Sequence, residues 1–149
     1  MRISRFCAAA ALLLAATVIP PFSATAAVQG WFNWRGPQQN GTSTEKNLPD
    51  KLDAKNPLWV KDFPGASTAV LANGKVYIVC YLGDGPDLQE GIACFDAESG
   101  QPLWQQMFSD FLSDIIYKRY ASSSPAIDEE TGNVYLQGTQ GISRWRTMT

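Results

Sequence analysis

Two segments of the chain recur in the same order, and this internal repeat limits the fold more than any other feature. Residues 57–63 return as residues 102–108, and both copies begin Pro-Leu-Trp and end in Phe. Residues 67–77 return as residues 124–135, and both copies carry Ser, then Gly, then a closing Val-Tyr pair. One match could arise by chance, but two in the same order indicate a chain built from repeated supersecondary units.

Each unit has the composition and spacing of β-structure. The predicted strands are residues 68–71, 76–82, 92–95 and 102–107 in the first unit, and residues 124–127 and 133–137 in the second. Asn73-Gly74 joins the first two strands, and this dipeptide favours a tight hairpin. Four short antiparallel strands at a period of about 40–50 residues are typical of a β-propeller blade. We therefore predict an all-β fold, a β-propeller represented by about one and a half four-stranded blades.

Residues 108–120 interrupt the β pattern. Their apolar side chains fall at helical spacing, with Asp110 early and Lys118-Arg119 late in the segment. We expect a short amphipathic helix or a looped insert that packs its apolar stripe on the propeller. After Ile142 the alternation of apolar and polar residues breaks. We therefore expect the second blade to stay incomplete, as at the start of a longer, truncated propeller.

The N-terminus has the features of a secretory signal peptide. Two arginines precede an apolar run, which is followed by Pro-Pro and the small-residue stretch 23–27. The run is shorter than the roughly 20 residues that span a bilayer, so no membrane span is expected after cleavage. We predict a signal peptide over 1–27, a lead-in segment over 28–56 and a partial propeller over 57–149. The predicted location is secreted or periplasmic.

Composition excludes several classes of function. The chain has no histidine, which excludes Ser-His-Asp and Cys-His catalysis and every His-ligated metal site. Its three cysteines are too few and too far apart for a four-thiolate zinc site. The 12 Lys and Arg are balanced by 14 Asp and Glu, so no nucleic-acid partner is expected.

The segment from Gly91 to Trp104 resembles the blade motif of pyrroloquinoline-quinone-type (PQQ-like) propellers. In that family, each blade has a strand of alternating apolar residues followed by the motif D-A-x-T/S-G-x-x-x-W. The matching residues here are Asp96, Ser99, Gly100 and Trp104, with Trp59 as the tryptophan of the preceding repeat. The Asp and Ser side chains can close a turn on backbone amides, and Gly permits a positive φ. The resemblance implies that the tryptophans pack between neighbouring blades, with their N–H groups bonding across the gap.

A second segment, residues 34–41, resembles the W-R-G-P-x-x-x-G lead-in of exported members of this family. The resemblance covers about residues 31–141 and implies an exported protein-interaction or scaffold module. Such a module would be similar to the periplasmic scaffold of the outer-membrane β-barrel assembly machine. It would bind protein partners or further blades of the propeller. One alternative is a fragment of a PQQ-dependent alcohol or sugar dehydrogenase, which would bind the quinone and calcium. Another is a non-functional truncated product.

No catalytic residue is assigned, because Asp96 and Asp128 are expected to serve as turn residues. Cys80 and Cys94 lie on consecutive predicted strands. They are expected to be two buried free thiols, or a disulfide if Leu82 pairs near Ile92.

An acidic, glycine-rich loop lies between the second and third predicted strands. Asp84, Asp87 and Glu90 offer hard oxygen ligands at close spacing, which could bind calcium. Because the loop lacks the EF-hand pattern, a plain solvent loop is favoured.

Overall fold

The computed structural model describes residues 29–109, 121–138 and 141–146. The predicted signal peptide, and all but the first two residues of the predicted insert, lie outside the described residues. The described chain is all-β apart from one short 3-10 turn, η1 (Gly85–Asp87).

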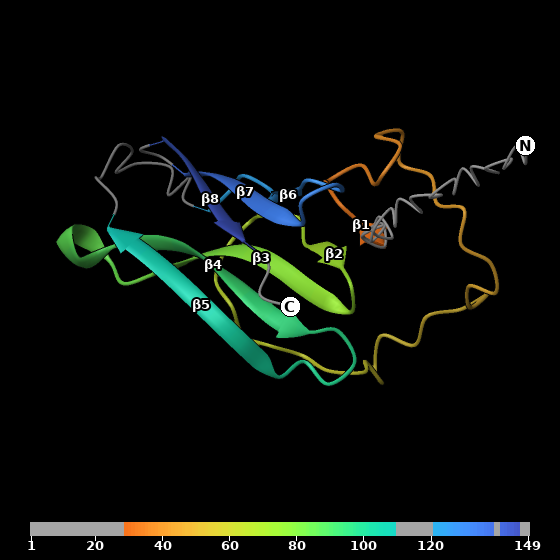
Figure 1. Ribbon diagram of the computed structural model, residues 1–149. Helices are drawn as coiled ribbons and strands as arrows, with labels where there is room; N and C mark the ends of the chain where they lie inside the picture. The colour runs from red at the N-terminus through yellow and green to blue at the C-terminus, as the bar shows by residue number, and fades with distance from the viewer. Residues whose placement is uncertain (1–28, 110–120, 139–140, 147–149) are drawn as a thin grey trace, which may run out of the picture.

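The strands form two antiparallel sheets (Figure 1). The first sheet follows chain order and contains β1 (Gly30–Trp31), β2 (Val70–Ala72), β3 (Lys75–Leu82), β4 (Gln89–Asp96) and β5 (Pro102–Ser109). The second contains β6 (Ala126–Ile127), β7 (Asn133–Gly138) and β8 (Gly141–Arg146). Within the described residues the two sheets do not close into a ring.

The hairpin between β2 and β3 turns at the dipeptide that the sequence indicates. Ala72 pairs with Lys75, and both Asn73 and Gly74 have positive φ, 49° and 71°. A two-residue hairpin of type I′ requires this geometry, which explains the preference for Asn-Gly.

The most buried strand is β4. Six consecutive residues, Glu90 to Phe95, are buried, so both faces of this strand are covered. On β3, Tyr77 and Val79 are buried on one face, whereas Val76 and Ile78 on the other face are half-buried. β4 is therefore covered on both faces, whereas the second face of β3 is fully covered only at Cys80.

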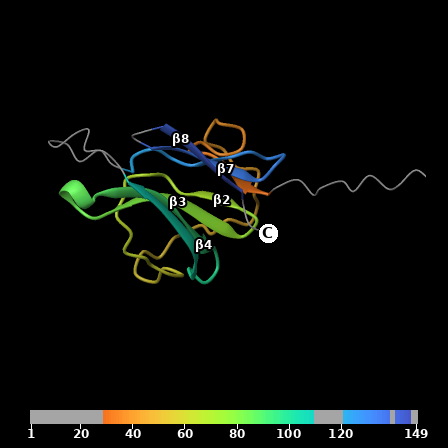
Figure 2. The same ribbon diagram turned by 60° about the vertical axis from the view of Figure 1, so that its left-hand side comes forward.

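The three-stranded sheet lies against one face of the five-stranded sheet (Figures 1 and 2). Val134 and Leu136 of β7 belong to the same buried cluster as Tyr77, Val79 and Ile92 of the first sheet. Burial of these apolar side chains is the main stabilising contribution at the junction.

The N-terminal segment joins the two sheets at β2 and β6. β1 pairs with β2, and the next residue, Phe32, accepts a hydrogen bond from the Ile127 N–H of β6 at 2.8 Å. The Phe32 side chain is buried in the shared core. The segment therefore contributes to the core.

The break in side-chain alternation after Ile142 does not end the β-structure, and the second sheet has three strands among the described residues. Residues Gly141–Arg146 form β8, which pairs with β7 from Gly138↔Gly141 to Asn133↔Arg146. Strand pairing is made by backbone hydrogen bonds and does not depend on the side chains. Because Ile142 and Arg144 are both exposed, an alternating apolar pattern is not needed here and could not reveal the strand.

The predicted start of the insert is also corrected. Phe108 lies in β5, opposite Glu90 of β4, and not at the beginning of a helix. The fourth strand therefore extends to Ser109, two residues beyond the predicted end at Met107.

Candidate functional site

The turn between β4 and β5 is closed by the residues that the blade motif names. The Ser99 N–H and hydroxyl both donate to Asp96 Oδ1, at 2.8 and 2.7 Å. The Gly100 N–H donates to the Asp96 carbonyl at 2.9 Å, and Gly100 has a φ of 67°. The bonds from Ser99, first its backbone N–H and then its hydroxyl, lower the pKa of Asp96.

The turn between β6 and β7 has nearly the same bonding. The Gly132 N–H donates to the Asp128 carbonyl at 2.8 Å, and the Thr131 hydroxyl and the Glu130 N–H donate to the Asp128 carboxylate. The Thr131 bond is the main cause of the lowered pKa of Asp128. Both carboxylates are therefore used to shape turns.

Trp59 docks on the first of these turns. Its indole N–H donates to the Ala97 carbonyl at 2.9 Å, and its ring centroid lies 6.4 Å from that of Phe95. A Cβ added at Gly100 would lie 2.6 Å from Trp59 Cδ2. The ring therefore lies directly over the glycine, where no larger residue fits.

Trp104, the repeat equivalent of Trp59, has different surroundings. It lies on β5 opposite Cys94, is half-buried, and has its ring centroid 6.0 Å from that of Tyr77. Among the described residues, its ring contact is thus with its own sheet.

The two cysteines do not face each other. Cys80 pairs with Gly91 and Cys94 with Tyr77, because Leu82 pairs with Gln89 and not near Ile92. The short turn η1 closes this hairpin and starts β4 three residues before the predicted third strand. Both cysteines are free and buried. Burial raises the pKa of the Cys80 thiol to about 11 and also raises that of Cys94.

The three candidate calcium ligands are not brought together in one loop. Asp84 and Asp87 flank or end η1 and are exposed, whereas Glu90 lies in β4 and is 3% exposed. The Glu90 carboxylate accepts a hydrogen bond from the Ala121 N–H at 2.6 Å. Among the described residues, no group of three or more Cys, Asp or Glu side chains could hold a metal ion.

Glu90 lies where the two sheets meet, a position that its sequence context did not indicate. A Cβ added at Gly138 of β7 would lie 2.9 Å from the Phe108 ring and 3.4 Å from Glu90 Oε2. Glu90 of β4 and Phe108 of β5 are paired directly opposite each other, so their side chains lie next to each other and both face β7. Only the pairing of β4 with β5 reveals this arrangement.

A cleft beside Trp31 is a second feature that the sequence did not single out. Trp31 packs on Gly36, where an added Cβ would lie 2.7 Å from Trp31 Cη2. The available signal was the Arg-Gly-Pro lead-in, whose glycine accommodates this ring. Hollows of about 600 and 300 Å³ lie beside Trp31.

Comparison of the chain with protein-family models, with curated proteins and with solved structures finds no match. In the part of the chain that the structure describes, no helix is long and apolar enough to cross a membrane.

Proposed function

We propose that this chain is a segment of an exported β-propeller of the PQQ-like repeat type, acting as a non-catalytic scaffold for protein partners. The observation that carries the proposal is the docking of Trp59 on the 96–100 turn. One contact unites the tryptophan of one repeat with the glycine and turn carbonyl of the next.

The way the motif residues are used supports a scaffold. Asp96 and Ser99 bond to each other, Gly100 makes room for a ring, and Asp128 shapes the equivalent bonding in a second turn. These residues stabilise the repeat itself, so ligands would be recognised by surfaces and loops.

The alternative, a fragment of a quinoprotein dehydrogenase, has less support. Its cofactor is an anionic quinone carrying carboxylates, and the charged side chains that line the Trp31 cleft are the carboxylates of Glu45 and Glu129. These like charges oppose binding of the quinone by itself, so the cleft would need bound calcium to hold it.

Reconstitution tests the choice between the two functions. The full chain is incubated with the quinone and calcium, freed of unbound quinone, and assayed for a bound chromophore and for dye reduction with alcohols and sugars. A known quinoprotein dehydrogenase serves as the positive control. We expect neither signal, and a stoichiometric chromophore with dye reduction would overturn the scaffold proposal.

A photo-crosslinking experiment tests the scaffold directly. A photoreactive residue replaces Leu103, which is 47% exposed on β5, in the native host. The matched control carries the same residue at buried Leu136. A discrete protein adduct from the exposed position alone is expected, and no adduct from either position would contradict a scaffold that binds through this strand.

A further inference from the structure

The two hollows beside Trp31 adjoin each other and share part of their lining. The shared residues are Gln29, Gly30, Trp31 and Glu45. The larger hollow continues over β2 and its turn to Gly74, and the smaller one extends to Pro37 and Glu129. Their volumes, about 600 and 300 Å³, lie in the range of small-ligand sites.

Trp31 is held as a fixed wall between the hollows. It pairs with Leu71 across the β1–β2 ladder, and its ring packs on the buried Gly36. The φ of Gly36 is 79°, so the turn beneath the ring depends on glycine. Because turn and ladder fix the ring, little conformational entropy is lost when a ligand contacts it.

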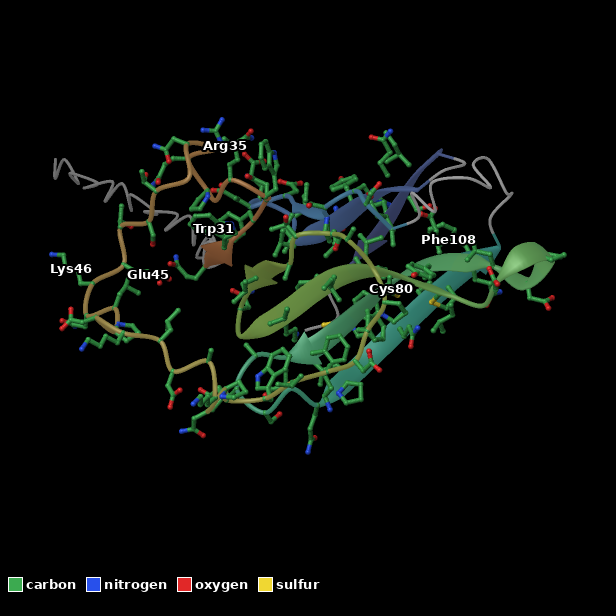
Figure 3. All side chains as sticks on the ribbon, turned by 180° about the vertical axis from the view of Figure 1, so that it is seen from behind. Trp31, Arg35, Glu45, Lys46, Cys80 and Phe108 are labelled. Atoms are coloured by element: carbon green, nitrogen blue, oxygen red, sulfur yellow. The ribbon has the colours of Figure 1, made fainter. Side chains whose placement is uncertain are left out.

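The charge of the cleft has one sign. Glu45 lines both hollows and Glu129 lines the smaller one, and neither lining includes a Lys or Arg side chain. The nearest basic residues in sequence, Arg35 and Lys46, point away from Trp31 (Figure 3). Arg35 lies over the Trp34 ring, 5.6 Å from its centroid.

We propose that the Trp31 cleft binds an organic cation, the guanidinium or ammonium group of an Arg or Lys side chain on a partner polypeptide. The ring face attracts a cation, and the two carboxylates add charge complementarity. The exposed apolar surface of Leu71 accommodates the alkyl part of the side chain. The cation chemistry rests on the cleft alone, whereas its polypeptide source rests on the proposed scaffold function.

The test compares a charged probe with its neutral isostere. Nα-acetyl-arginine methylamide and the matching citrulline derivative are titrated into the full chain while the assigned indole N–H resonance of Trp31 is followed by NMR. We expect a saturable shift with arginine, and one at least about fivefold weaker with citrulline, because only arginine carries the charge. Equal binding of the two probes would overturn the proposal.

Carboxylate variants test the assignment to this cleft. Glu45→Gln should weaken arginine binding about threefold, the effect typical of an exposed charge. Glu130→Gln is the matched control, because Glu130 is exposed beside Glu129 but lines neither hollow. An equal effect of the two substitutions would place the binding elsewhere.

The source of the cation is tested separately with tetramethylammonium and an arginine-containing tetrapeptide. The tetrapeptide should bind at least about tenfold more tightly, since its backbone extends along the larger hollow. If tetramethylammonium binds as tightly, the polypeptide source is wrong. Arginine binding without a photo-crosslinked partner at Leu103 would instead contradict a scaffold that binds through β5 and would leave the cation site intact.

Discussion

Gly100→Ala should destabilise the chain through Trp59. The φ of Gly100 is 67°, so an alanine there costs about 1 kcal/mol in backbone strain. Its Cβ would also lie 2.6 Å from Trp59 Cδ2 and would displace the ring. Displacement removes the indole hydrogen bond, about 1 kcal/mol, and the contact with Phe95, about 0.5–1.5 kcal/mol. The total is about 3 kcal/mol.

Gly74→Ala is the matched control for this substitution. Gly74 has a similar φ of 71°, and no atom lies within 4 Å of an added Cβ. This variant should therefore lose only the backbone part, about 1 kcal/mol. The free energy of unfolding is measured for both by urea denaturation, followed by far-UV circular dichroism at equal protein concentration.

A double-mutant cycle isolates the docking contact. In a Trp59→Leu background, Gly100→Ala should cost about as much as Gly74→Ala, because the large ring is gone. If Gly100→Ala and Gly74→Ala are equally costly in the wild-type background, Trp59 does not dock on this turn.

Three further outcomes are expected. Glu90→Ala should lower the free energy of unfolding by about 1–3 kcal/mol, because the buried Ala121 N–H loses the carboxylate to which it donates. An unchanged urea midpoint would contradict this. Turn hydrogen bonds lower the folded-state pKa of Asp96 and Asp128, so their stabilising contribution is present above the unfolded pKa and is lost as pH falls through the folded one. Carboxyl NMR titration of the folded chain should place both midpoints below those of the urea-unfolded chain, and equal midpoints would refute the turn bonding. Cys80 and Cys94 should resist iodoacetamide at pH 8 in the folded chain, because burial raises the pKa of both thiols. Both should react in urea without reductant, because they are free. Mass analysis that finds fewer than two alkylated thiols in urea would contradict this.

Local chemistry explains why much of the fold could be predicted from the sequence. Asn73-Gly74 marks a hairpin because both residues tolerate positive φ, and Asp96 to Gly100 marks a turn because its side chains bond to nearby backbone. Such signals depend only on neighbours in the chain. They predict where strands and turns occur, but they do not predict the length of a strand.

Features that depend on distant residues were missed. The turn η1 sets the pairing of β3 with β4, which lies three residues away from the register in which Cys80 would face Cys94. The local sequence places Glu90 in a loop, because its burial arises only when β4 pairs with β5 and meets β7. The hydrogen bond from Ile127 to Phe32 joins residues 95 positions apart, which no local pattern reports.

The two neighbouring sheets share one core, which the N-terminal segment joins through Phe32. The most direct measurement is a carbon-edited NOESY spectrum of the full chain with assigned Phe32, Val70, Ile127 and Val134 side chains. We expect nuclear Overhauser effects that link side chains of both sheets, among them contacts from the Phe32 ring to Ile127 of the second sheet. Effects confined within each sheet, with none between them, would contradict it.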